Sequence, residues 1–252
     1  MATVSIVVPV YNAENFIQST IAMVQAQTFE DWEMIMVEDG STDDTRLILQ
    51  DLMENTLDKR LKVIFLEDNK DGPAPARNAG VEAATGRYIA YLDADDVWKR
   101  NKLERTLEFM KEKNAGFVFT AYEFGDEQAN PTGKIVHVPD TLSYRQALSR
   151  TVIFTSTVLF DTTKIGKDLI KMPVVPSEDT ATWWNILRNG HIAYGLEEVL
   201  AVYRRPAVSL SSNKGKAIVR IWNLYRNVEK LSIIKSAWYF CGWAVRATLR
   251  RL

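Results

Sequence analysis

Short apolar runs alternate with helical patterns along the first half of the chain. Residues 4–10 form a continuous, largely β-branched run, which is typical of a strand buried on both faces. In residues 16–24 apolar side chains recur at helical spacing, and Asn12 is the expected cap of that helix. The same alternation predicts strands at 32–37, 61–66, 88–92 and 117–124, and helices that begin at Ser41 or Thr42 or span 76–84 and 99–113. This order predicts an α/β fold with a mainly parallel sheet and right-handed crossovers.

The regular alternation stops after Gly125. The polar stretch 126–134 predicts a turn between two strands. The elements expected after it are a helix at 143–149, a strand at 152–160, a helix at 179–187, a strand at 199–203 and two helices at 214–230 and 233–249. The sequence therefore predicts one domain over residues 1–212, with halves of about 1–125 and 126–212, and an amphipathic helical tail at 213–252.

The formal net charge of −1 conceals a strong asymmetry. From Arg204 to the end the chain has 11 basic residues and one acid, Glu229, whereas the preceding 203 residues have 20 basic and 31 acidic ones. A basic tail on an acidic body predicts an anionic partner at the tail. Because the tail's bases alternate with apolar positions, we expect a membrane surface and no nucleic acid.

The last predicted helix has the composition of a membrane-surface helix. It carries three aromatic residues typical of membrane interfaces and four basic ones: Trp238, Tyr239 and Trp243, then Lys235, Arg246, Arg250 and Arg251. An alternative is that the aromatics pack on the domain or on a second subunit, which would make a homo-oligomer. No run approaches the ~18 apolar residues of a span. With a single cysteine, Cys241, and no pattern of a secretory signal, the expected location is cytoplasmic and peripheral on the inner face of the plasma membrane.

Unusual polar residues follow several of the predicted strands. Ligands in such folds bind beyond the carboxyl ends of the strands. Asp93, Asp95 and Asp96 come directly after the strand at 88–92, and three carboxylates in four residues repel one another unless a cation or donors lie opposite. Mg²⁺ and Mn²⁺ take such oxygen ligands, so this segment is a candidate metal site. The alternative is a solvated turn, with Asp96 as a helix cap.

Three further residues share that edge. Asp39 is placed to accept from a nucleobase or a ribose hydroxyl, or to form a turn with Gly40. Tyr11 either stacks under a base or ends a core strand, and Arg77 either binds a diphosphate or is a surface charge. Each of these residues is weak evidence when taken alone, but their joint position at successive strand ends favours a nucleotide site.

Three motifs together resemble the family-2 glycosyltransferases of GT-A fold, in order and in spacing. They are VSIVVPVYNAENFI, VEDGSTDDT and GPAPARNAGVEAATGRYIAYLDADD. SEDTATWW is similar to that family's acceptor-side base motif, YRRPAVSLSSNK to its donor-closing loop, and the carboxyl end to its teichuronic-acid and capsular-polysaccharide type. The resemblance implies a GT-A, Rossmann-like fold. It also implies inverting transfer of a sugar from a nucleotide diphosphate sugar to a hydroxyl of a lipid-linked saccharide in cell-surface polysaccharide synthesis, with a donor half and an acceptor half.

The resemblance also implies roles for particular residues. Tyr11 and Asp39 are assigned to the nucleobase, Asp95 together with Asp93 to Mn²⁺ or Mg²⁺, and Asp179, with its neighbour Glu178, to the catalytic base. The donor contacts implied are Pro9, Tyr11, Glu14, Asp39, Arg77, Asp93 and Arg204. Two departures stand out: Glu38 occupies a position where the family commonly has Asp, and Arg205-Pro206 stands where many relatives have a histidine.

The acidic pair fits the proposed chemistry. Because Glu178 and Asp179 are adjacent, they disfavour ionising together, and one of them is expected to have the raised pKa of a base. The alternative is that both acids stabilise the start of a helix. Trp183 follows Asp179 by four residues, so we expect it to stack on an acceptor sugar, and we expect Trp184 in the core.

Two other functional classes compete with this interpretation. A metal-dependent phosphotransferase or phosphatase also uses an Asp-x-Asp pair, but on its first strand, whereas here the pair follows the fourth. A non-catalytic nucleotide-binding module is the second alternative. His137 and His191 have no ligand-type neighbours at metal-binding spacing, so no zinc chemistry is expected.

Overall fold

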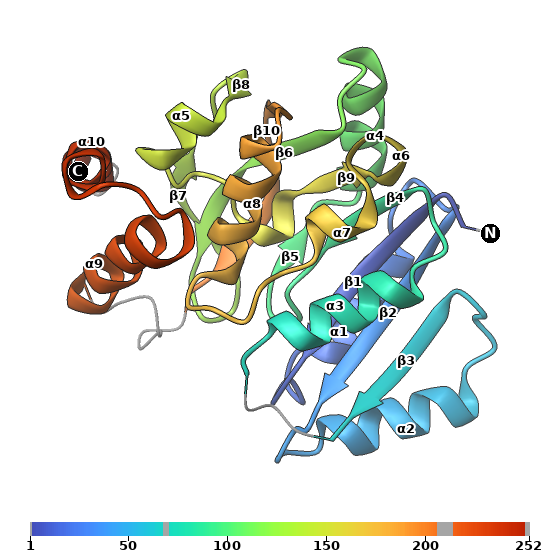
Figure 1. Cartoon of the computed structure of the whole chain (residues 1–252). Coiled ribbons are helices and arrows are strands. Elements are labelled where there is room, and N and C mark those ends of the chain that lie inside the picture. The colour runs from blue at the N-terminus through green and yellow to red at the C-terminus, as the bar shows by residue number, and fades with distance from the viewer. Residues whose placement is uncertain (1, 68–70, 206–213, 250–252) are drawn as a thin grey trace.

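In the part of the chain that the structure describes, ten strands form one mixed sheet with helices on both of its faces (Figure 1). The computed structural model describes residues 2–67, 71–205 and 214–249. Along the sheet the strands follow the order β3-β2-β1-β4-β9-β6-β10-β5, and β7 and β8 pair at the side with β6 and β10. The α/β architecture with a mainly parallel sheet is therefore confirmed.

The first half supplies the parallel part of the sheet. Its elements are β1 (Val4–Val10), α1 (Ile17–Gln25), β2 (Trp32–Asp39), α2 (Thr45–Asn55), β3 (Leu61–Leu66), α3 (Ala74–Ala83), β4 (Tyr88–Tyr91), β5 (Val97–Trp98), α4 (Lys102–Glu112) and β6 (Phe117–Gly125). β1 pairs in parallel with both β2 and β4, and β2 pairs in parallel with β3. Every residue of β2 is buried, its three acidic residues included, as expected for a parallel strand covered on both faces. The carboxyl ends of these strands consequently meet at one edge.

The second half extends the same sheet. Its elements are β7 (Pro131–Val136), β8 (Thr141–Leu142), α5 (Tyr144–Leu148), the 3₁₀ turn η1 (Thr155–Thr157), β9 (Leu159–Asp161), α6 (Thr162–Ile165), α7 (Lys167–Ile170), α8 (Glu178–Arg188) and β10 (Ala193–Arg204). β9 lies antiparallel between β4 and β6, and β10 pairs in parallel with β6. β9 thus joins the strands β3-β2-β1-β4 to the strands β6 and β10 in one sheet.

One predicted strand of the second half and several predicted helix starts are wrong. The strand expected at 152–160 is mostly irregular, because hydroxyls such as Thr157 Oγ1 bind nearby carbonyls and form η1 before β9 begins. Asn12 does not cap α1; it has a left-handed backbone, and its Oδ1 accepts from Thr42 N–H at 2.8 Å. Likewise α2 begins at Thr45 after Asp44, and α4 follows Asn101, so Asp96 is not a helix cap.

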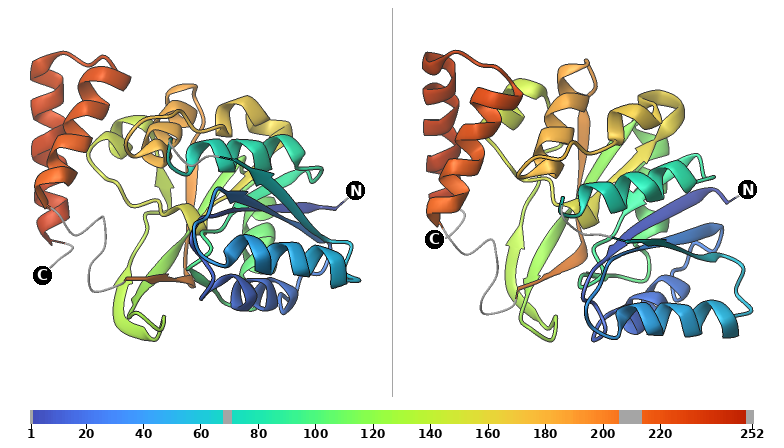
Figure 2. Two further views of the ribbon diagram at one scale, coloured as in Figure 1. Left: turned by 90° about the horizontal axis from the view of Figure 1, so that it is seen from below. Right: turned by 60° about the horizontal axis from the view of Figure 1, so that its bottom comes forward.

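The carboxyl-terminal segment packs on the body. It consists of α9 (Lys214–Asn223), the π-helical turn η2 (Leu224–Val228) and α10 (Ile233–Leu249), with α9 and α10 side by side at one end of the molecule (Figure 2). Tyr225 stacks on Trp184 of α8, with ring centroids 5.3 Å apart and planes 7° apart. Arg188 of α8 pairs with Glu229 at 3.2 Å. Trp184 is therefore a core residue, as predicted. None of the described helices is long and apolar enough to cross a membrane.

Candidate active site

Two cavities adjoin at the carboxyl edge of the sheet. The first, of about 440 Å³, is lined by the ends of β1 and β2, the start of α3 and the loop after β4. Its lining includes these predicted site residues: Pro9, Tyr11, Asp39, Arg77, Asp93 and Asp95. Tyr11 is half exposed, whereas Asp39 is buried. The structure therefore brings together most of the donor and metal residues that strand order predicts.

The second cavity, of about 530 Å³, lies on the other side of the same acids. Arg77, Asp93 and Asp95 line both cavities. Glu178 and Asp179, at the start of α8, line only the second. Its remaining wall comes largely from η1, α9, η2 and α10. The two cavities are thus separate spaces that meet at three charged residues.

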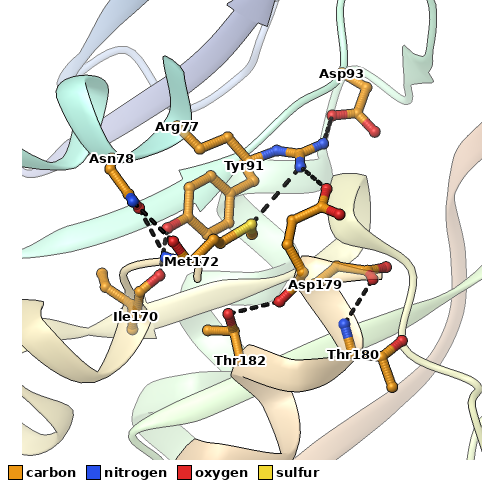
Figure 3. Close-up of polar contacts among 10 residues, drawn as sticks. Arg77, Asn78, Tyr91, Asp93, Ile170, Met172, Asp179, Thr180 and Thr182 are labelled. Atoms are coloured by element: carbon orange, nitrogen blue, oxygen red, sulfur yellow. Dashed lines mark hydrogen bonds and ion pairs between the residues drawn. The ribbon is translucent and has the colours of Figure 1, made fainter. Parts of the chain in front are cut away.

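Arg77, on α3, contacts both the acidic loop after β4 and the start of α8 (Figure 3). Its Nη2 donates to Asp93 Oδ1 at 2.6 Å, and its Nη1 donates to Glu178 Oε1 at 2.8 Å and lies 3.6 Å from Met172 Sδ. The side chain is buried. Burial alone would lower the pKa of Arg77, but the Asp93 and Glu178 carboxylates outweigh it and raise that pKa. Arg77 is therefore a fixed cation that ties α3 to the acidic loop and to α8, and its predicted contact with the nucleotide stays a prediction.

The acidic loop after β4 is held from both sides. Asp93 N–H donates to Ser156 Oγ at 3.0 Å, and Ser156 Oγ donates to Asp96 Oδ2 at 2.5 Å. Arg204 N–H lies 3.3 Å from Asp96 Oδ1, and Arg204 Nε donates to the Asp95 carbonyl at 2.6 Å. Burial, with Asp93 and Asp95 nearby, raises the pKa of Asp96 well above its ordinary value. Asp96 is therefore a buried loop support, a role that sequence patterns missed along with that of Ser156.

Asp93 and Asp95 fit a divalent cation. Burial and then the nearby Asp93 raise the pKa of Asp95, so a bound cation would stabilise its charged form. The described residues contain no group of three or more His, Cys, Asp or Glu that could hold a metal ion. Mg²⁺-type sites commonly combine one or two carboxylates with substrate phosphates, so two acids facing the first cavity are a sufficient protein contribution.

The acids of α8 differ in their surroundings. Glu178 is engaged by Arg77, and burial followed by repulsion from Asp179 raises its pKa. Asp179 accepts from Thr180 N–H at 2.6 Å, and burial raises its pKa as well. Within the described residues no ion pair holds the Asp179 carboxylate. Its position in the second cavity leaves Asp179 as the better candidate to accept a proton.

Trp183 is not an acceptor platform. It is only 2% exposed and packs among three aromatic rings of the core: Tyr91 at 6.3 Å, Phe117 at 5.5 Å and Phe160 at 5.5 Å between centroids. The four-residue spacing from Asp179 is correct for one face of α8, but Trp183 lies on the part of that helix packed against the sheet. The prediction for Trp183 is wrong because spacing does not show which side of a helix is covered.

Two predicted donor contacts also lie outside both cavities. Glu14 Oε2 accepts from Asp44 N–H at 3.0 Å and so links the loop before α1 to the start of α2. Arg204 binds the carbonyls of Asp95 and Glu127, and its guanidinium lies 4.6 Å from the Phe16 ring centroid. These contacts give both residues a part in supporting the loops, and their predicted contacts with the donor stay predictions. Residues 206–213 of the predicted donor-closing loop lie outside the described residues.

The departure at Glu38 is explained by the turn after β2. Its Oε1 accepts from Ser41 N–H at 2.5 Å, and its Oε2 pairs with Arg46 at 3.3 Å. Glu38 is fully buried, so it shapes the strand end that carries Asp39. The longer side chain therefore serves the turn, and Asp39 faces the first cavity.

Comparison with known proteins agrees with this geometry. Residues 5–166 match the family described as Glycosyl transferase family 2. A Bacillus subtilis (strain 168) protein named as a teichuronic acid biosynthesis glycosyltransferase, TuaG, is 44% identical over 250 residues, covering 99% of this chain and 97% of that one. The Escherichia coli protein named UDP-Glc:alpha-D-GlcNAc-diphosphoundecaprenol beta-1,3-glucosyltransferase WfgD is 36% identical over 222 residues, covering 88% and 84%.

Two solved structures share the fold at low sequence identity. Staphylococcus aureus TarS 1–349 in complex with UDP-GlcNAc aligns with a TM-score of 0.70 and 21% identity, covering 97% of this chain and 72% of that one. The mannosyltransferase PcManGT from Pyrobaculum calidifontis, in complex with GDP-Man and Mn²⁺, aligns with a TM-score of 0.70 and 20% identity, covering 96% and 73%.

The sheet, its helices and these structural matches define the class as proteins of GT-A fold. Within that class the chain belongs to glycosyltransferase family 2, since the family match spans more than half of it and TuaG is similar over nearly its whole length. The competing interpretation as a phosphotransferase or a non-catalytic module is therefore not favoured.

Proposed function

We propose that this glycosyltransferase transfers a sugar, with inversion, from a nucleotide diphosphate sugar to a hydroxyl of a lipid-linked saccharide in cell-surface polysaccharide synthesis. One observation carries the proposal: the two cavities meet at Arg77, Asp93 and Asp95. A donor in the first cavity and an acceptor in the second would therefore face each other across the acidic loop. WfgD, whose name specifies a diphosphoundecaprenol-linked acceptor, supports the acceptor class.

The first cavity suits a nucleotide. Tyr11 offers an exposed ring for a base, and the buried Asp39 lies at the end of β2 beside it. Asp93 and Asp95 would hold Mn²⁺ or Mg²⁺ against the diphosphate, as their position between the cavities allows. When bound, that ion supplies positive charge to the departing diphosphate. The mannosyltransferase with bound GDP-Man and Mn²⁺ supports this choice of cation.

The protein's own part in the reaction is proton removal and orientation. Asp179 lines the second cavity, and its raised pKa suits it to take the acceptor hydroxyl proton as that oxygen attacks the sugar carbon. Glu178, bound to Arg77, keeps the start of α8 at a fixed position relative to Asp93. An acceptor on the face opposite the diphosphate gives the in-line approach that inversion requires.

The outer faces of α9 and α10 support a peripheral position on the inner face of the plasma membrane. Their exposed apolar side chains are Ile218, Val219, Ile233, Ile234, Trp238 and Val245. Trp238 is 76% exposed and Ile234 83%, and Lys235 and Arg246 of α10 are exposed as well. Tyr239 and Trp243 instead pack toward the body, so the expectation that all three aromatics face a membrane is corrected to Trp238 alone.

The direct test is a panel of UDP-, GDP- and dTDP-sugars, each incubated with Mn²⁺ and a synthetic GlcNAc-diphospho-decyl acceptor. Release of free nucleoside diphosphate that depends on the metal and on the acceptor is the expected result for at least one donor. If none of the three nucleoside diphosphates binds more tightly with Mn²⁺ than without it, the first cavity is not a donor site and the proposal fails.

A further inference from the structure

One face of α9 lines the second cavity. Ala217, Arg220, Ile221 and Leu224 follow the spacing of neighbours on a helix surface and all border this space. Glu178 and Asp179 border it from α8. The stack of Tyr225 on Trp184 and the ion pair of Arg188 with Glu229 fix the α9–η2 segment to that catalytic helix. α9 is thus a built wall of the site rather than a detached tail.

Arg220 is the available cation of this cavity. It is half-buried, and within the described part of the chain its guanidinium has no hydrogen bond or ion pair. The other arginine of the cavity, Arg77, is already bound to Asp93 and Glu178. The other charged residues that the structure describes in this lining are acidic. An anionic group on a bound acceptor would therefore be attracted to the α9 side of the cavity and repelled from the acidic side.

Trp243 of α10 gives the same cavity a fixed aromatic ring. Its Nε1 donates to Thr151 Oγ1 at 3.1 Å, and its ring centroid lies 5.6 Å from that of Phe240. These contacts set the orientation of the indole before any ligand arrives. A preorganised ring offers large contact area at little cost in conformational entropy, which suits packing against the face of a sugar.

The outer faces of the same two helices carry exposed apolar residues, with Ile218 and Val219 on α9 and Trp238 on α10. We propose that α9 and α10 form an acceptor subsite in which Arg220 binds the phosphate that links the saccharide to its lipid, while Trp243 packs on the saccharide ring. This inference rests on the proposed function and deepens it. It explains why the cavity wall and the surface suited to a lipid bilayer belong to the same pair of helices.

The test measures binding of three probes by calorimetry to the full chain loaded with Mn²⁺ and UDP: GlcNAc-diphospho-decyl, the neutral decyl glycoside of GlcNAc, and decyl glucuronide. We expect the wild type to bind the diphosphate probe most tightly. Arg220→Gln should weaken that probe roughly tenfold or more and leave the neutral glycoside unchanged, as expected for loss of a charge-assisted contact. Trp243→Leu should weaken all three probes by similar factors. Lys235→Gln, an exposed charge of α10 outside the cavity, is the matched control.

The outcomes separate this inference from the proposed function. Mn²⁺-dependent UDP binding reports the donor site and should be unchanged in Arg220→Gln. If wild type binds the diphosphate probe no better than the neutral glycoside, including failure to bind either, the phosphate subsite is overturned. A glucuronide bound as tightly as the diphosphate probe would overturn the assignment to phosphate in favour of a sugar carboxylate. An equal loss for charged and neutral probes in Arg220→Gln would show only a structural role for that residue.

Discussion

Asp95 borders both cavities from the loop after β4, and burial with Asp93 nearby raises its pKa. Asp95→Asn removes a candidate metal ligand and keeps the carbonyl that Arg204 binds. We therefore expect loss of the Mn²⁺-dependent increase in nucleoside diphosphate affinity, with an unchanged unfolding temperature. Calorimetry with UDP and GDP, with and without Mn²⁺, measures this effect. Asp51→Asn, on the exposed side of α2, is the control. Full Mn²⁺ enhancement in Asp95→Asn would place the metal elsewhere.

Lys102 is a second residue with a measurable consequence. It is fully buried at the start of α4, its Nζ lies 4.1 Å from the Trp98 ring centroid, and among the described residues that nitrogen has no hydrogen-bond partner. Burial lowers the pKa of Lys102 to about 7. The unfolded chain keeps this proton up to about pH 10.4. Burying the protonated amine therefore destabilises the fold fully below about pH 7. This destabilisation declines as the pH rises toward the pKa of Lys102 in the unfolded chain.

We accordingly expect Lys102→Met to raise the free energy of unfolding by roughly 1–3 kcal/mol at pH 7, because an apolar chain of similar length replaces a buried amine. The gain should shrink between pH 7 and pH 10. Urea denaturation at both pH values tests this. A destabilised variant, or a gain independent of pH, would show that the Trp98 contact outweighs the cost of burying the amine.

At the scale of elements, the bounds of strands and helices were predicted correctly where apolar residues recur in a regular pattern. β1 and β3 have the predicted bounds. β1 is a mostly β-branched run buried at the centre of the sheet, as expected for a parallel strand covered on both faces, whereas β3 lies at the edge of the sheet and is only partly buried. α10 also has the predicted bounds. The segment before β9 could not be predicted, since Thr and Ser side chains there bind backbone carbonyls locally. The path of α9 depends on the stack of Tyr225 on Trp184, a long-range contact that no periodicity shows.

The C-terminal helices give a prediction at this scale. Trp238 and Ile234 are exposed, whereas Trp243 lines the second cavity. Trp238→Ser with Ile234→Ser should therefore reduce flotation with anionic vesicles and leave metal-dependent UDP binding unchanged. Each basic residue near such a surface contributes about 1 kcal/mol, so some flotation at low salt should persist. A chain cut after Lys230 should lose flotation. Flotation by that truncated chain, or none by the full chain, would contradict the role of α10 as the anchor.

At the scale of the whole molecule, the sheet order explains how much of the site was predictable. Tyr11, Asp39, Asp93 and Asp95 gather at one edge because parallel strands end together. Trp183 failed because helical spacing does not reveal which face a sheet covers. The loop-supporting contacts of Glu14 and Arg204 could not be predicted, because their partners lie about 30 and 109 residues away in the chain, distances over which sequence pattern carries no information.

Asp179 is the proposed base between donor and acceptor. Asp179→Asn should keep Mn²⁺-dependent nucleotide binding and lower turnover roughly 10²–10⁴-fold. Because burial raises the pKa of Asp179, wild-type turnover should fall with decreasing pH at a value above the ordinary aspartate pKa. Glu178→Gln, which weakens an Arg77 contact, should lower turnover less.

The most direct measurement is acceptor-dependent release of nucleoside diphosphate by wild type, Asp179→Asn and Glu178→Gln under saturating donor and Mn²⁺. We expect Asp179→Asn to bind donor normally and to show the larger loss of turnover. Turnover close to wild type in Asp179→Asn, or a larger loss in Glu178→Gln, would contradict the assignment of Asp179 as the base.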